Sequence, residues 1–148
     1  MSGTKVQVEL GEGTIVRLRA RGHDWNADEP VEARGTDQGP NPYELLLGAL
    51  GSCTALTLRF YAHHKQWPLD SVQVDYDFAR EYAKDCAECE EDGSARLDVI
   101  RANVIIRGRF DDAQKARLTE VVARCPVHRT LTGGPKMFET VTFEESAR

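Results

Sequence analysis

The feature that most constrains the fold is one long apolar stretch, YELLLGALGSCTALTLRFYAHH, which follows Pro42. Its apolar residues do not alternate with polar ones as in a half-buried strand, and it has almost no polar face before Arg59. Pro42 suits the first turn of a helix, and Asn41 before it is a good N-cap. The sequence therefore predicts a helix from Asn41 to about Lys65. Because this helix is apolar nearly all round, we expect it to be buried.

The segments on either side of this helix predict sheets that surround it. Alternation of apolar and polar residues indicates strands, and the apolar spacing of LTEVV indicates an amphipathic helix. The expected elements are a hairpin over 5–20, a loop over 21–40 with room for a short third strand, paired strands over 71–78 and 100–110, helices over 111–124 and 125–132, and a last strand over 136–144. The sequence thus predicts an α+β fold, with antiparallel sheets around a buried central helix, in one domain over 1–148.

Two local features of these elements make sharper predictions. Asp111 followed by Gln114 has the capping-box pattern that starts a helix. Asp75 and Asp77 lie on the polar face of their strand, so we expect them to pair with arginines of the strand opposite.

Charge and hydropathy exclude several classes of protein. The net charge of -5 and the pI of about 5.4 argue against binding to nucleic acid. The sequence begins without the apolar core of a signal peptide. We find no uninterrupted apolar run of the roughly 20 residues that a spanning helix needs. We therefore expect a cytoplasmic protein that binds no nucleic acid and does not enter a membrane.

Two of the four cysteines lie alone in the sequence. Cys125 precedes Pro126, which places it at the N-cap of the predicted short helix, where free N–H groups stabilise a thiolate. A small packing or capping role explains Cys125 equally well. Cys53 lies in the middle of the apolar helix, where burial raises the pKa of a thiol, so by itself it indicates packing.

The other two cysteines, Cys86 and Cys89, form the pair CAEC among acidic residues. Nearby carboxylates raise the pKa of a thiol and weaken it as a nucleophile. A structural zinc ion needs four ligands and this pair supplies two, so a metal site needs further ligands, either a second pair across a two-fold axis or His63 and His64. A dithiol on the surface and a disulfide that staples the loop are the other interpretations. The sequence has neither a G-x-S-x-G nor a P-loop pattern, and we expect no cofactor.

Two motifs together, GPNPYELLLGALGSCTALTL and CPVHRTL, resemble the OsmC/Ohr family of osmotically inducible and organic-hydroperoxide-resistance proteins. The resemblance covers essentially the whole chain, and the acidic DCAECE loop resembles the OsmC-like bacterial branch. It implies an intertwined homodimer with active sites between the subunits. It also implies a thiol-dependent peroxidase for organic hydroperoxides, in which Cys53 attacks the peroxide and Cys125 resolves the sulfenic acid as a disulfide. The reductant implied is a dithiol of the lipoyl type.

The resemblance also implies an arginine that holds Cys53 as a thiolate and a glutamate that holds the arginine. Arg19 and Arg21 are the candidates, with Arg21 favoured, and Glu44 is the candidate glutamate. In the hydroperoxidases of the family the glutamate directly follows the NP pair, whereas here Tyr43 takes that position. One residue turns a side chain by about 100° on a helix, so Glu44 is expected to point elsewhere or the helix to begin differently.

Two other functions remain open. The first alternative to the peroxidase is a thiol–disulfide carrier or sensor that also uses Cys86 and Cys89, and the second is a non-enzymatic module that binds an apolar small molecule. In the second case the cysteines serve only for packing.

Overall fold

The N-terminal part of the chain forms a small antiparallel sheet. The computed structural model describes residues 3–91 and 93–147. The sheet has the order β1-β2-β3, made of β1 (Gln7–Leu10), β2 (Val16–Ala20) and β3 (His23–Ala27). The predicted hairpin is confirmed, and the segment after it does contain a third strand. A short 3-10 turn, η1 (Val31–Ala33), follows the sheet.

The long helix α1 (Pro42–Lys65) begins as the sequence predicts. The Asn41 side chain accepts a hydrogen bond from the Glu44 N–H at 2.8 Å, and the Glu44 carboxylate accepts one from the Asn41 N–H at 2.7 Å. Both halves of a capping box are therefore present. The helix ends where Gln66 takes a left-handed conformation.

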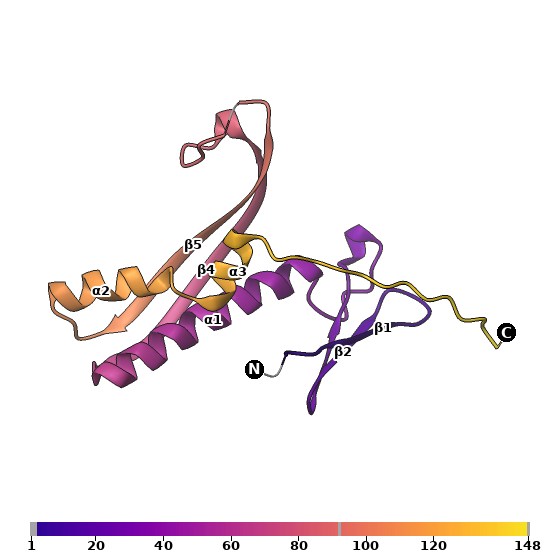
Figure 1. The fold of residues 1–148 in the computed structure, drawn as a ribbon, viewed down its shortest axis with the longest axis horizontal. Coiled ribbons are helices and arrows are strands. Elements are labelled where there is room, and N and C mark those ends of the chain that lie inside the picture. Colours follow the sequence, from indigo (N-terminus) through magenta and orange to yellow (C-terminus); the bar gives the residue numbers. More distant parts are fainter. Residues whose placement is uncertain (1–2, 92, 148) are drawn as a thin grey trace.

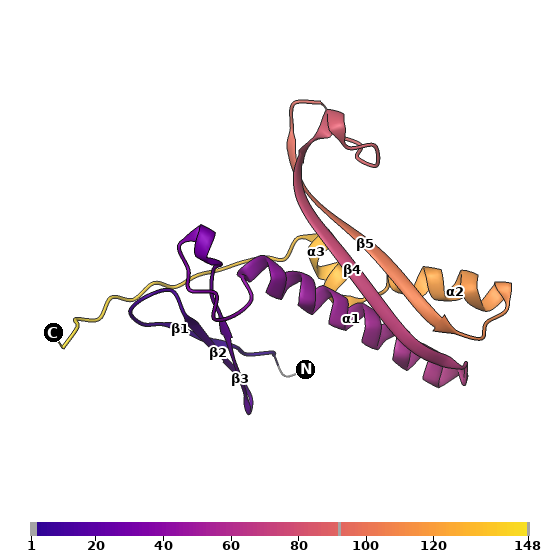
Figure 2. The same ribbon diagram turned by 180° about the vertical axis from the view of Figure 1, so that it is seen from behind.

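A long hairpin packs along α1 (Figures 1 and 2). It consists of β4 (Leu69–Tyr82) and β5 (Arg96–Gly108), which pair antiparallel, with the 3-10 turn η2 (Ala83–Asp85) at its tip. Helix α2 (Asp112–Val122) follows, capped by Asp111 and Gln114 as expected. The core lies between α1, this hairpin and α2, and its buried residues are Leu58, Ala62, Leu69, Leu118 and Val121.

The ion pairs across the hairpin differ from the expected ones. Asp77 does lie opposite Arg101 in the register, but Arg101 binds Glu81. Asp75 lies opposite Asn103 and accepts a hydrogen bond from Gln73. The prediction was wrong because a long arginine side chain reaches past the residue opposite to a partner farther along the strand.

Helix α1 is buried on one face only within this chain. Leu50, Thr54, Leu58 and Ala62 recur at four-residue spacing and are buried, whereas Phe60 is 66% exposed. A single small sheet covers one side of a helix, so the prediction of a fully buried helix is not met within one chain. By length and composition alone, α1 would also be long and apolar enough to cross a bilayer, a test that core helices of globular proteins pass as well.

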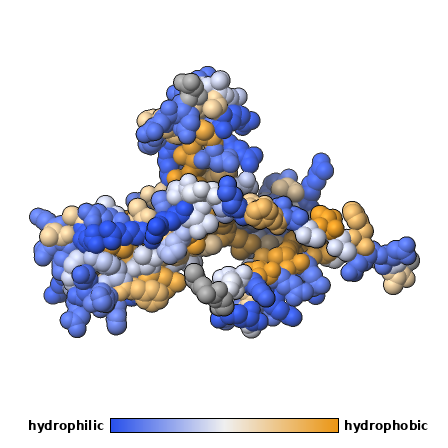
Figure 3. All heavy atoms as spheres, in the orientation of Figure 1, coloured by the Kyte–Doolittle hydropathy of each residue, from blue (hydrophilic) through white to orange (hydrophobic). Residues whose placement is uncertain are grey.

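The expected last strand is not formed. Beyond Gly134 the chain is extended and runs past the N-terminal sheet without joining it (Figures 1 and 2). Phe138 is 92% and Phe143 93% exposed, and apolar surface gathers along this segment and the neighbouring sheet (Figure 3). The strand pattern is present, but within the described chain the segment lacks a strand beside it to pair with.

Candidate functional site: two thiols between helices α1 and α3

The site forms where the short helix α3 (Pro126–Gly133) meets the middle of α1. Cys125 is the N-cap of α3, as predicted, and it is completely buried. Its Sγ donates a hydrogen bond to the Leu50 carbonyl oxygen of α1 at 3.9 Å, and its thiol lies close enough to that of Cys53 for each to shift the pKa of the other. Cys53 is half-buried, and both thiols are free. Two cysteines far apart in the sequence are thus neighbours, and Cys53 is the more accessible.

The surroundings of the two thiols shift their pKa values in opposite directions. Burial raises the pKa of Cys53, and the hydrogen bond with Cys125 raises it further. Burial also acts against ionisation of Cys125, but the hydrogen bond from Cys53, the N–H groups of His128 and Val127, and the Thr54 hydroxyl lower its pKa below the usual value. N–H groups at a helix start stabilise a thiolate. These shifts favour ionisation of Cys125 over that of Cys53.

A cavity of about 390 Å³ lies near Cys125, although neither cysteine of the pair is among its lining residues. It lies between α1, the β4–β5 hairpin and α3, and its lining is mainly apolar. Leu50 and Thr54 belong both to this lining and to the surroundings of Cys125. An apolar molecule of moderate size therefore has a place beside the thiol pair.

His128 of α3 also lines this cavity. Its Nδ1 atom is buried and has no hydrogen-bond partner in the described part of the chain. A buried polar atom without a partner is uncommon and favours a ligand or water at this point.

The candidate arginines lie on the N-terminal sheet. The Arg19 Nε atom binds the Asp24 carboxylate at 2.7 Å on an exposed surface. Arg21 occupies the turn between β2 and β3, with φ of 56°. Within the described residues, the pKa of Cys53 is shifted by its burial and by Cys125, Val127 and Thr57, and by no arginine. The structure of one chain therefore brings neither arginine to the site, and their role stays a prediction.

Glu44 and Tyr43 both have partners within the same chain. The Glu44 carboxylate caps α1 through the Asn41 N–H. The ring of Tyr43 stacks on Phe78 with centroids 4.6 Å apart, and its hydroxyl accepts a hydrogen bond from Arg80 at 2.9 Å. In the structure, the position after the NP pair thus joins α1 to β4.

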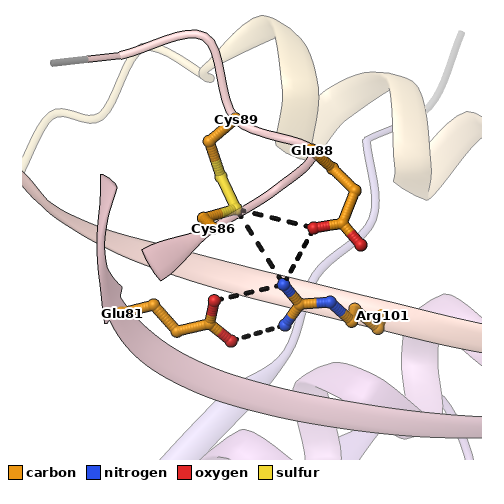
Figure 4. A network of polar contacts seen from close by, with 5 residues as sticks. All are labelled: Glu81, Cys86, Glu88, Cys89 and Arg101. Atoms are coloured by element: carbon orange, nitrogen blue, oxygen red, sulfur yellow. Dashed lines mark hydrogen bonds and ion pairs between the residues drawn. A yellow bond between two sulfur atoms is a disulfide. The ribbon is translucent and has the colours of Figure 1, made fainter. Parts of the chain in front are cut away.

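The CAEC pair is a disulfide (Figure 4). Cys86 and Cys89 have Cα atoms 5.4 Å apart at the tip of the β4–β5 hairpin, beside Arg101. A zinc ion binds thiolates, which this oxidised pair does not offer. Within 3–91 and 93–147, no group of three or more His, Cys, Asp or Glu is placed to hold a metal ion.

Sequence reasoning missed several groups that shape the site. Thr54 and Thr57 of α1 bond to the thiols, and the Val127 N–H of α3 contacts both of them. The four-residue spacing from Cys53 to Thr57 and from Leu50 to Thr54 was visible in the sequence. Which face of α1 meets α3 was not.

Comparisons with known proteins agree with this fold. The family model described as "OsmC-like protein" matches residues 35–139. An OsmC-like protein from Mycoplasma pneumoniae has a similar structure, with a TM-score of 0.70, 18% identity, and coverage of 90% of this chain and 89% of that one. An organic hydroperoxide resistance protein OsmC from Legionella pneumophila matches with a TM-score of 0.59, 18% identity, and coverage of 90% and 91%. An organic hydroperoxide resistance protein from Elizabethkingia anophelis matches with a TM-score of 0.61, 11% identity, and coverage of 90% and 91%.

No curated protein matches the chain by sequence. The family model nevertheless covers most of the chain, and the solved structures share its mixed α+β architecture with antiparallel sheets. The two cysteine motifs, the element order and the packing of α3 on α1 all fit the same conclusion. The chain belongs to the OsmC/Ohr family.

Proposed function

We propose that the protein is a thiol-dependent peroxidase that reduces organic hydroperoxides with Cys53 and Cys125. The observation that carries the proposal is the contact between an accessible thiol, Cys53, and a buried thiol, Cys125, at a helix N-terminus. Solved structures named as organic hydroperoxide resistance proteins share the fold, which supports a redox function.

In the proposed reaction the proton shared by the two thiols moves to Cys125, which leaves Cys53 as the thiolate. The Cys53 thiolate attacks the peroxide O–O bond, so Cys53 becomes a sulfenic acid, and the leaving alkoxide takes the proton of Cys125 and departs as the alcohol. The Cys125 thiolate then attacks the Cys53 sulfur, hydroxide leaves and takes a proton from solvent to become water, and a disulfide forms. An external dithiol returns both residues to thiols by disulfide exchange.

The choice of an organic peroxide follows from the cavity. Its apolar lining offers hydrophobic contacts to an alkyl or aryl group and few hydrogen bonds to hydrogen peroxide. We therefore expect organic hydroperoxides to react faster than hydrogen peroxide.

We propose further that the active form is a homodimer. The exposed apolar residues of the C-terminal segment, β1 and α1 support this, because one chain leaves them in contact with water. Burying Phe138 and Phe143 against a partner contributes about 2 kcal/mol for each side chain. In such a dimer Arg19 or Arg21 would lie beside Cys53 and stabilise its thiolate.

The dimer is tested by sedimentation of the full chain and of Phe138→Ser/Phe143→Ser. These side chains are almost fully exposed in one chain, so the variant should keep its fold. Its dimer should dissociate at a higher protein concentration than the wild-type dimer does. A wild-type protein that sediments as a monomer at all concentrations would contradict the dimer.

The peroxidase is tested by stopped-flow mixing of the reduced protein with cumene hydroperoxide while thiol loss is followed. Wild type should lose the two thiols of Cys53 and Cys125, Cys53→Ser should keep its Cys125 thiol, and Cys125→Ser should accumulate a sulfenic acid that dimedone traps. Cys89→Ser is the matched control and should react like wild type at Cys53. Thiol loss that is unchanged in Cys53→Ser would exclude the mechanism.

One observation favours a second function, the binding of an apolar small molecule without catalysis. Burial raises the pKa of Cys53, which disfavours the thiolate that a peroxidase needs. If this function is correct, the reduced protein should be unreactive to hydroperoxide and should retain a hydrophobic ligand through purification.

A further inference from the structure

A second pair of cysteines lies outside the thiol site. Cys86 and Cys89 are joined at the tip of the β4–β5 hairpin, which projects away from the helices (Figure 2). A disulfide that closes so short a loop restricts the unfolded chain less than one that closes a long loop. Persistent disulfides are also rare in reducing compartments, where those present are usually redox-active. A purely structural staple is therefore the weaker interpretation of this bond.

The two cysteines are unequally exposed. Cys86 is only 6% exposed, whereas Cys89 is half-buried. A hollow of about 400 Å³ lies beside the bond, lined by both cysteines, Glu88, Glu91 and Arg101. Because thiol–disulfide exchange requires an attacking thiolate to reach one sulfur, Cys89 is the sulfur that an incoming thiol meets.

The buried sulfur has a cation beside it. Arg101 Nη2 donates toward Cys86 Sγ at 3.9 Å (Figure 4). If Cys89 is attacked, Cys86 is the leaving group, and a leaving thiolate departs faster when its charge is stabilised. The position of Arg101 thus favours the same direction of attack as the difference in access.

Two carboxylates hold Arg101 in place. Glu81 accepts hydrogen bonds from both Nη atoms, at 2.5 and 3.1 Å, and Glu88 accepts one from Nη2 at 3.1 Å. Nη2 has only two hydrogens for three acceptors, which are Glu81, Glu88 and Cys86 Sγ. Glu88 also lies 3.8 Å from Cys86 Sγ, where its charge opposes a thiolate. Glu81 therefore positions the guanidinium, whereas Glu88 competes with Cys86 for it.

We propose that Cys86 and Cys89 form a second redox site, a reversible disulfide that exchanges with thiols through Cys89 and releases Cys86 as a thiolate stabilised by Arg101. A thiolate of an external dithiol bonds to the Cys89 sulfur as the Cys86–Cys89 bond breaks and its electron pair goes to Cys86. The second thiol of the reductant then attacks the mixed disulfide. The reductant leaves as a disulfide, and both cysteines end as thiols after taking up the two protons that the dithiol lost.

The direction of attack is tested on the oxidised wild-type protein with glutathione, followed by acid quenching, alkylation and trypsin digestion. Cleavage after Lys84 and Arg96 places both cysteines in one peptide, separate from Cys53 and Cys125. Fragmentation should locate glutathione on Cys89 and the alkyl group on Cys86. Glutathione located mainly on Cys86, or a bond that ordinary thiols leave intact, would overturn the proposal.

The role of Arg101 is tested by the rate at which dithiothreitol reduces the bond. Arg101→Gln should slow reduction by roughly threefold or more, Arg101→Lys should recover much of the rate, and Glu88→Gln should accelerate it. A variant that merely loosened the hairpin tip would expose the disulfide and speed its reduction. Slower reduction in Arg101→Gln therefore indicates loss of the charge, whereas faster reduction indicates local unfolding. Faster reduction in Arg101→Gln, or no change in either Gln variant, would refute the role of Arg101.

The acidic lining defines the class of thiol that this site accepts. Glu88 and Glu91 repel anions, so cysteamine should react faster than mercaptoethanesulfonate at equal thiolate concentration, and added salt should reduce the difference. Equal rates for the two thiols would contradict this preference.

Discussion

Gly48 and Gly51 of α1 offer a matched pair of substitutions that tests how β4 packs beside the thiol site. A Cβ built on Gly51 lies 2.9 Å from Cε2 of Tyr76, whereas a Cβ on Gly48 meets nothing within 4 Å. Carbon atoms in favourable contact are about 3.5–4.0 Å apart, so the Tyr76 ring must move by about 0.6–1 Å to admit Gly51→Ala. The Tyr76 hydroxyl lies 3.3 Å from Thr54 Oγ1, which in turn contacts Cys125.

Both substitutions gain helix propensity, but only Gly51→Ala brings the added methyl group against Tyr76. Replacing glycine by alanine within a helix gains about 1 kcal/mol in either case. Overpacking at Gly51 costs about 1–3 kcal/mol. Gly48→Ala should therefore be more stable than wild type by up to about 1 kcal/mol, and Gly51→Ala should be less stable than Gly48→Ala by about 1–3 kcal/mol.

The assay is urea unfolding of both variants at one protein concentration, with thermal midpoints as a second measure. A gain of 1 kcal/mol corresponds to a rise of about 4 °C for a chain of this length. Equal stability of the two variants would refute the close contact between Gly51 and Tyr76. A loss of stability in Gly48→Ala would show that another surface approaches Gly48 in the folded protein.

Three further predictions concern the site and the N-terminal sheet. Cys53→Ala removes a group that lowers the pKa of Cys125, and Cys125→Ala removes a group that raises the pKa of Cys53. The pH dependence of the ultraviolet absorbance of the thiolates, which needs no access to buried Cys125, should show Cys125 becoming less acidic and Cys53 more acidic; shifts in the opposite directions would contradict the interaction of the two thiols. Glu44→Gln keeps a side chain that caps Asn41, so unfolding should change little, and a large loss of peroxide reactivity would then reveal a role for its charge at the thiols. Buried Asp28 accepts hydrogen bonds that hold its pKa well below the usual range, so it stabilises the fold above about pH 4 and less as the pH falls; Asp28→Asn should be less stable at pH 7, with a difference from wild type that shrinks in acid, and a difference independent of pH would contradict this assignment.

Local sequence was enough to predict the elements whose ends are set by local chemistry. Asn41 with Pro42 marks the start of α1, and Asp111 with Gln114 marks that of α2, because a cap depends on residues within one turn. The placement of Cys125 at the start of α3 follows from the same reasoning. Its pairing with Cys53 came instead from the resemblance of two motifs, since no local rule joins residues so far apart.

Contacts between distant side chains could not be read from the pattern. Arg101 was expected to meet an aspartate and binds Glu81, because partner choice depends on how far each side chain reaches across the sheet. Glu44 caps α1, as its position three residues after Asn41 indicates, whereas the resemblance implies that it holds an arginine. The C-terminal segment has a strand pattern, but among the described residues it pairs with no strand.

The most direct test of the proposed function is to map the disulfide that forms when the reduced protein meets one equivalent of cumene hydroperoxide. Trypsin releases Cys125 in the short peptide Cys125–Arg129, so a bond to Cys53 appears as one cross-linked species. We predict that this species forms in proportion to the peroxide consumed and disappears on reduction by a dithiol. Consumption of peroxide without a Cys53–Cys125 bond, or no consumption at all, would contradict the proposed function.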